Sequence, residues 1–233
     1  MTSPNQSLRK GQDASPQDSW AEYLRTLEKL EYKRARNQLT RYQPYPKQIE
    51  FHRNGATYNE RLFMAGNQLG KTLAGGAECA YHLTGLYPDW WDGLRFDEPP
   101  LIWATGVTNE TTRDNPQRVL LGPPAREEDW GTGWIPADCI LGTTRALGTA
   151  NLLDNIQVKH VNGTSQCGFK AYEKGREKWQ GPTVHLVWFD EEPPADIYSE
   201  GKTRTNAKGV HTMITATPLK GMSEVIRAFM LDE

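Results

Sequence analysis

The sequence of 233 residues contains no apolar run approaching the roughly 18 residues that a membrane-spanning helix needs, and its mean hydropathy is −0.71. Its first 30 residues contain no apolar segment of the secretory-signal type. The three cysteines form no Cys-x-x-Cys pair, so neither a disulfide framework nor a structural zinc site is indicated. With 27 basic and 29 acidic residues, the chain lacks a general positive coat for nucleic acid, although a local basic patch is compatible with this balance.

What is present is enough apolar sequence for one large domain behind an N-terminal extension. Residues 1–18 are rich in Ser, Gln, Pro, Asp and Gly, which predicts a disordered tail. Ser19 and Glu22 have the spacing of a capping box, and apolar residues then recur at helical spacing. We therefore expect an N-terminal helical segment over residues 19–41 and a folded domain over residues 42–233.

Four short apolar runs have the length of buried parallel strands. A helical stretch over residues 71–83 separates the first two, and alternating residues around Asn162 and Gly163 predict a hairpin between the second and third. The sequence thus predicts an α/β fold, with a mostly parallel central sheet flanked by helices and ligands at the carboxyl ends of the strands. The four runs are RLFMA (61–65), LIWATG (101–106), VHLVWF (184–189) and HTMITA (211–216).

The first run leads into a pattern typical of a P-loop, in which a buried strand is followed by small residues and then a helix. Backbone N–H groups of such a loop can approach phosphate closely, and the helix adds the positive end of its dipole. Lys71 is placed to reach the β- and γ-phosphates, and the hydroxyl of Thr72 to bind Mg²⁺. The residues predicted to bind the nucleotide are Ala65, Gly66, Asn67, Gln68, Leu69, Gly70, Lys71 and Thr72.

The third run ends in two carboxylates, which is the pattern of a Walker B element. We expect Asp190 to hold Mg²⁺ through water and Glu191, which points elsewhere, to orient or deprotonate the attacking water. Alone, the pattern would be better explained as an acidic cap on a strand, but a P-loop upstream favours the catalytic interpretation. Glu192 is expected to be a surface or supporting acid because two prolines follow it.

Two further patterns are weaker. Hydroxyl residues end the fourth run, where they either bond to water near the γ-phosphate or simply close a strand before a proline; this segment is Thr215, Ala216, Thr217 and Pro218. Upstream of the P-loop, the amide of Gln48 is suited to an adenine edge, and the rings of Tyr42 and Tyr45 are suited to stacking on the base.

From about Tyr42 to its C-terminus, the chain resembles the large terminase subunit of tailed double-stranded DNA bacteriophages, and most closely the podovirus type that packages DNA by a headful mechanism. The segments that carry the likeness are RLFMAGNQLGKT, AYHLTGLYP, KAYEKGREKWQG, VWFDEEPPADIYSEG with TRTN after it, and TPLKGMSEV.

This resemblance implies a P-loop NTPase fold of the ASCE/RecA-like class and an ATPase that uses ATP and Mg²⁺ to move double-stranded DNA into a procapsid. It implies the portal protein and the small terminase subunit as partners, self-association into a ring (expected to be a pentamer) on the procapsid, no membrane association, and a place in the cytoplasm of the infected bacterium. Lys71 and Thr72 match its Walker A pair, Asp190 and Glu191 its Walker B pair, residues 215–218 its coupling motif, and Gln48 with its aromatic neighbours its adenine segment.

The sequence departs from the family pattern at two places. Asn67 occupies a position where some terminases carry an arginine, so the arginine that acts on the γ-phosphate is expected from a neighbouring subunit. Arg118 is the favoured residue, with Arg113, Arg176 and Arg204 as alternatives. The chain also stops soon after the coupling motif, so we expect the ATPase domain alone, without the nuclease domain.

Two other functions share this nucleotide machinery. A helicase core would need a second motor domain, for which 233 residues are too few. A nucleotide-gated assembly module would bind ATP with little turnover, and Glu191 argues for catalysis instead.

Overall fold

The computed structural model describes residues 16–205, 211–218, 221 and 223–231, and the chain divides into two units at Ala35. The first unit contains helix α1 (Pro16–Ala35). The helix begins before Ser19, so the predicted capping box is wrong, and proline is well suited to a first helical turn. It also ends before residue 41, because residues 39–41 form a separate 3₁₀ turn. Residues 1–15 of the predicted tail lie outside the described residues.

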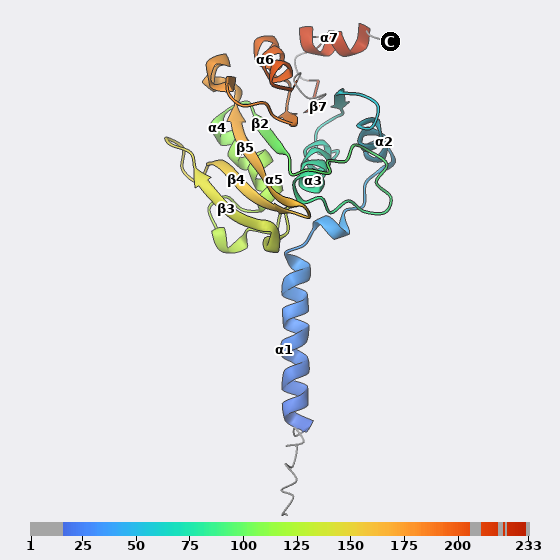
Figure 1. Cartoon of the computed structure of the whole chain (residues 1–233), viewed down its shortest axis with the longest axis vertical. Helices are drawn as coiled ribbons and strands as arrows, with labels where there is room; N and C mark the ends of the chain where they lie inside the picture. The colour runs from blue at the N-terminus through green and yellow to red at the C-terminus, as the bar shows by residue number, and fades with distance from the viewer. Residues whose placement is uncertain (1–15, 206–210, 219–220, 222, 232–233) are drawn as a thin grey trace, which may run out of the picture. The chain divides into compact units, whose positions relative to one another are not determined.

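The second unit is built on a seven-stranded sheet of order β1-β7-β6-β2-β5-β4-β3 (Figure 1). The first five strands in this order pair in parallel, and the last two pairings are antiparallel. The predicted mostly parallel sheet is therefore confirmed. The strands are β1 (Glu60–Met64), β2 (Leu101–Gly106), β3 (Ile140–Arg145), β4 (Leu153–His160), β5 (Gly163–Ala171), β6 (Leu186–Asp190) and β7 (His211–Ala216).

Prediction and structure agree closely for the buried strands. β2 and β7 have the predicted bounds, β1 begins one residue earlier, and β6 is shifted toward its carboxylates. The predicted hairpin is β4–β5, which turns between His160 and Gly163. β3 is not predicted from the sequence, because its side chains are mostly exposed and its sequence ILGTTR has no apolar alternation.

Helices cover both faces of this sheet (Figure 1). Small residues let α3 pack closely on it: a Cβ added at Gly75 would lie 2.6 Å from the indole of Trp188. None of the described helices is long and apolar enough to cross a membrane. The helices are α2 (Pro46–Asn54), α3 (Lys71–Thr84), α4 (Asn109–Thr112), α5 (Arg118–Leu121), α6 (Ala195–Thr205) and α7 (Glu224–Leu231), with a short π-helical segment (Arg113–Gln117) between α4 and α5.

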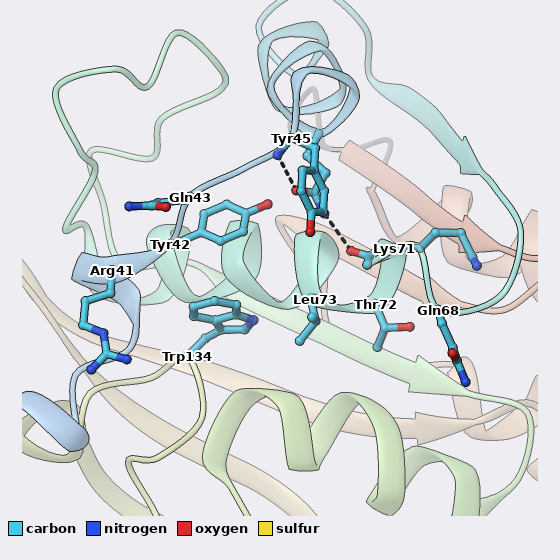
Figure 2. A pocket seen from close by; sticks show the side chains of 11 residues that line it. Arg41, Tyr42, Gln43, Tyr45, Gln68, Lys71, Thr72, Leu73 and Trp134 are labelled. Atoms are coloured by element: carbon cyan, nitrogen blue, oxygen red, sulfur yellow. Dashed lines mark hydrogen bonds between the residues drawn. The ribbon is translucent and has the colours of Figure 1, made fainter.

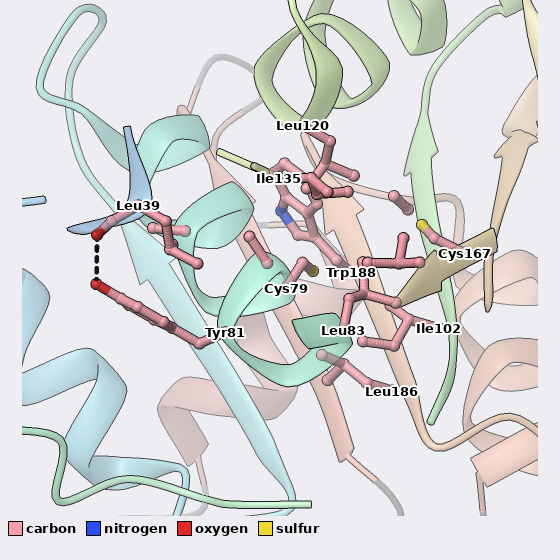
Figure 3. Close-up of a cluster of buried hydrophobic side chains, with 14 of the residues drawn as sticks. Leu39, Cys79, Tyr81, Leu83, Ile102, Leu120, Ile135, Cys167, Leu186 and Trp188 are labelled. Atoms are coloured by element: carbon pink, nitrogen blue, oxygen red, sulfur yellow. Dashed lines mark hydrogen bonds between the residues drawn. The ribbon is translucent and has the colours of Figure 1, made fainter. Parts of the chain in front are cut away.

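Two buried clusters hold these layers together. One lies on the α3 side of the sheet and includes Leu83, Ile102 and Trp188 (Figure 3). The other, on the opposite face, includes Trp179 and Phe189, whose rings stack at 5.6 Å. Since β1, β7 and β6 are neighbouring parallel strands between these clusters, their carboxyl ends come together at one edge of the sheet.

Candidate nucleotide-binding site

The loop between β1 and α3 has the backbone geometry of a phosphate cradle. Gln68 and Gly70 both adopt left-handed conformations, with φ of 60° and 77°. At Gly70 a side chain would also meet the amide nitrogen of Gln48, 2.9 Å from the added Cβ. Gly70 is the N-cap of α3, so the free N–H groups of the first turn and the positive end of the helix dipole lie at this loop.

Lys71 is a buried cation at this loop. It is 6% exposed, and its Nζ donates to the carbonyl oxygen of Gly66 at 2.8 Å. Within the described residues it forms no ion pair with a carboxylate. Its ammonium group has three donors, so this arrangement leaves donors for an anionic ligand in the loop.

Asp190 and Thr72 meet next to the loop. The hydroxyls of Thr72 and Thr215 both donate to Oδ1 of Asp190, at 2.8 and 2.9 Å. Asp190 is 2% exposed, and burial raises its pKa to about 7 although both hydroxyls oppose the rise. A carboxylate and a hydroxyl are the hard oxygen ligands that Mg²⁺ prefers, so these two side chains fit that ion. Near neutral pH a proton and a cation would compete for Asp190.

Glu191 turns away from Asp190 through an unusual backbone conformation. Its φ is 70°, a left-handed value that is uncommon for residues other than glycine. Its N–H donates to the carbonyl of Thr215 at 2.9 Å, and its own carbonyl accepts from the hydroxyl of Tyr172 at 2.9 Å. The carboxylate accepts from the backbone N–H of Thr217 at 3.1 Å. The carboxylates of Asp190 and Glu191 thus have different hydrogen-bond partners.

The end of β7 and the residue that follows it contact both carboxylates. Thr215 is fully buried; its hydroxyl accepts from the indole Nε1 of Trp188 at 2.8 Å while donating to Asp190. Ala216 ends the strand, Thr217 is 8% exposed and Pro218 is exposed. The strand end therefore joins the Walker B element by direct hydrogen bonds.

A cavity of about 530 Å³ extends from the P-loop across the first turn of α3 (Figure 2). Seven predicted nucleotide contacts line it: Tyr42, Tyr45, Gln48, Gln68, Gly70, Lys71 and Thr72. Ala65, Gly66, Asn67 and Leu69 belong to the loop but not to this lining. Four lining residues were missed: Arg41, Gln43, Leu73 and Trp134. Adjacency to Tyr42 could have indicated the first two, whereas nothing in the sequence brings Trp134 to this place.

The expected adenine segment has a structural role as well. Gln48 is 3% exposed; its Oε1 accepts from the N–H of Tyr45 at 2.8 Å, and its Nε2 donates to the carbonyl of Gly70 at 3.0 Å. Tyr42 is buried, with its hydroxyl 3.1 Å from Nε2 of His52. Tyr45 is exposed beside the cavity (Figure 2), so its ring is free to stack on a base. Contacts of these residues with adenine stay a prediction.

The four candidate arginines differ in their partners. Arg113 pairs with Asp114, and Arg176 and Arg204 both bind Glu200. Arg118 is exposed and, among the described residues, has no ion-pair partner. It lines a cavity of about 370 Å³ that shares Leu73 and Trp134 with the larger one.

Comparison with known proteins identifies the family to which the chain is similar. A family model described as "Terminase large subunit, T4likevirus-type, N-terminal" matches residues 62–232. The chain is 45% identical over 227 residues to the terminase large subunit of Salmonella phage P22, covering 90% of this chain and 46% of the relative. It is 27% identical over 226 residues to the terminase large subunit of Enterobacteria phage LP7, covering 90% and 47%.

A solved structure agrees at the level of the fold. The large terminase of a thermophilic bacteriophage has a TM-score of 0.52 at 14% identity, with 82% of this chain and 44% of that chain covered. The chain thus spans about half the length of the curated relatives it matches. Because the family model covers well over half of its residues, the chain belongs to the terminase large-subunit family.

Proposed function

We propose that this chain binds ATP with Mg²⁺ and hydrolyses it, and that hydrolysis drives the translocation of double-stranded DNA into a procapsid. The observation that carries the proposal is the meeting of three strand ends at one site. Asp190 at the end of β6 accepts from Thr72 of α3 and from Thr215 of β7, and Glu191, which follows β6, accepts from Thr217, which follows β7. Lys71 and Thr72, which follow the loop after β1, line the cavity.

Each side chain has a distinct role in this proposal. Lys71 supplies positive charge to the β- and γ-phosphates, and the loop N–H groups bind their oxygens. Thr72 and Asp190 would hold Mg²⁺, which neutralises charge on the phosphates when bound. Glu191 orients the attacking water and accepts its proton, because its carboxylate is bonded to Thr217, which also contacts Asn67 of the P-loop.

The wider role follows from the relatives, which are named terminase large subunits. On that basis we propose the portal protein, the small terminase subunit and DNA as partners, a ring on the procapsid, and action in the cytoplasm of the infected bacterium. No cluster of three or more metal-ligating side chains occurs within the described ranges, and the absence of DNA cleavage by this chain stays a prediction. Phosphate release from Mg²⁺-ATP tests the proposal, and an assembly module would bind ATP without releasing phosphate.

Arg118 is proposed as the arginine that a neighbouring subunit inserts at the γ-phosphate. An arginine in this role contributes roughly 10³- to 10⁵-fold in rate. The isolated chain should therefore turn over slowly, and its activity per subunit should rise with protein concentration. Arg118→Ala should remove that rise while ATP affinity stays nearly unchanged, which a concentration series of phosphate release would show.

Arg113→Ala is the matched control, because Arg113 already pairs with Asp114. It should keep the rise with concentration. Activity that is independent of concentration and survives Arg118→Ala would count against the proposal, and Arg176 or Arg204 would then be tested.

A further inference from the structure

Three hydrogen bonds link the P-loop to the Walker B carboxylate through one residue. The hydroxyl of Thr217 lies 3.0 Å from Oδ1 of Asn67, and the backbone N–H of Thr217 lies 3.1 Å from Oε2 of Glu191. The same hydroxyl is 3.5 Å from Oε1 of Glu191. Thr217 is 8% exposed, so these contacts are largely shielded from water.

The hydroxyl of Thr217 has one proton and two possible acceptors. Asn67 Oδ1 is at ordinary hydrogen-bond distance, whereas Glu191 Oε1 is at the outer limit. In this arrangement the proton goes to Asn67. Among the residues that the structure describes, the carboxylate of Glu191 is then held firmly by one donor, the backbone N–H of Thr217.

Asn67 is placed to respond to a phosphate. It is an exposed residue of the P-loop, and its Nδ2 donates to none of the residues that the structure describes. An amide N–H donates readily to a phosphate oxygen. Turning the side chain toward a bound phosphate takes Oδ1 away from Thr217, and the remaining acceptor for the hydroxyl proton is then Glu191.

We propose that Thr217 is a positioning residue whose hydroxyl is shared between Asn67 and Glu191, so that a phosphate in the P-loop adds a second donor to the Glu191 carboxylate. This inference rests on the proposed role of Glu191 in ATP hydrolysis. It adds the step that makes the orientation of the Glu191 carboxylate depend on the bound nucleotide.

The backbone of Glu191 is fixed, so the second hydrogen bond from Thr217 changes the orientation of the carboxylate alone. Its N–H is bound to Thr215 and its carbonyl to Tyr172, so the peptide group stays fixed while the side chain is reoriented. Two donors on two oxygens define the plane of a carboxylate, whereas one donor leaves it free to rotate. Loss of the hydroxyl should therefore slow turnover and leave nucleotide affinity nearly unchanged.

The test compares Thr217→Val, which removes the hydroxyl at nearly constant shape, with Thr217→Ser, which retains it. Thr217→Val should lower kcat by about tenfold to a hundredfold, the scale of a misoriented catalytic group. Affinity for a slowly hydrolysed ATP analogue should stay within about twofold, and Thr217→Ser should recover most of the rate. If the valine variant does not fold, Thr217→Ala replaces it.

Introducing Thr217→Val into the Glu191→Gln variant shows whether Thr217 acts through Glu191. In Glu191→Gln, adding Thr217→Val should lower the residual rate by less than about twofold, because the group that it positions is already lost. Independent of turnover, the amide of Thr217 should exchange hydrogen faster in Glu191→Ala than in the parent.

The possible results separate this inference from the proposed function. A parent chain without phosphate release overturns the proposed function. An active parent whose rate is unchanged by Thr217→Val overturns the positioning role alone. Equal losses in the valine and serine variants, an additive loss with Glu191→Gln, or an unchanged exchange rate would also overturn it.

Discussion

Glu191→Gln should lower the rate of ATP hydrolysis by about 10²- to 10⁴-fold, the usual contribution of a general base. The amide has the shape of the carboxylate and can still accept from the N–H of Thr217, but it cannot take a proton from water. Asp190, Thr72 and Lys71 are untouched, so binding of a labelled ATP analogue should stay within about threefold. Steady-state phosphate release and a binding titration measure the two quantities.

Glu192→Gln is the matched control. Glu192 is adjacent in sequence but lines a separate cavity with Pro193 and Pro194. It should keep nearly the parent rate. Loss of activity in Glu192→Gln together with full activity in Glu191→Gln would exchange their roles.

The second large effect concerns stability. Glu78 of α3 is fully buried and contacts Arg61 of β1 and His52 of α2, so it ties together the three elements around the P-loop. Removing one partner of a buried ion pair leaves the other charge uncompensated. Glu78→Ala should therefore lower the free energy of unfolding by about 3–5 kcal/mol, measured by urea titration.

The exposed Glu98 provides the control, and Glu98→Ala should change the free energy of unfolding by less than about 0.5 kcal/mol. Equal stability of the two variants would show that the buried cluster contributes nothing net.

Stability should also depend on pH through Glu78. Burial opposes its ionisation, but Arg61 and hydrogen bonds with His52 and His82 hold its pKa well below the ordinary 4.5. An acid with a lowered pKa stabilises the folded state above its unfolded pKa, and this is lost as pH falls toward the folded value. Below pH 4.5 the parent should therefore lose stability faster than Glu78→Gln, as parallel thermal melts would show.

The elements predicted best from the sequence are those with a strong local pattern. β2 and β7 are apolar on both faces, and the Asn162–Gly163 turn marks its hairpin, so local composition was sufficient. β3 was missed because it lies at the edge of the sheet, where exposed strands need little apolar sequence. At α1 the capping-box pattern was misleading, since a helix can begin at a proline without it.

The candidate site likewise contains residues that a local sequence pattern predicts and residues that only the fold brings in. The P-loop and Walker B residues follow from a strand followed by a particular short sequence, and the structure brings them together. Trp134 enters the cavity only through tertiary packing, because a loop distant in sequence folds against the ring of Tyr42. The contact between Thr217 and Asn67 spans 150 residues and carries no local signal.

Phosphate release from Mg²⁺-ATP by the parent chain and by Lys71→Ala tests the central claim most directly. The alanine variant removes a buried cation from the P-loop. Since a hydrogen bond to a charged group contributes about 1.5–3 kcal/mol, loss of two phosphate contacts should weaken ATP binding by about a hundredfold or more. We expect saturable release from the parent, and none above background from Lys71→Ala, with Lys159→Ala, an exposed lysine of β4, behaving as the parent does. Equal release by the parent and Lys71→Ala would contradict the assignment of this site.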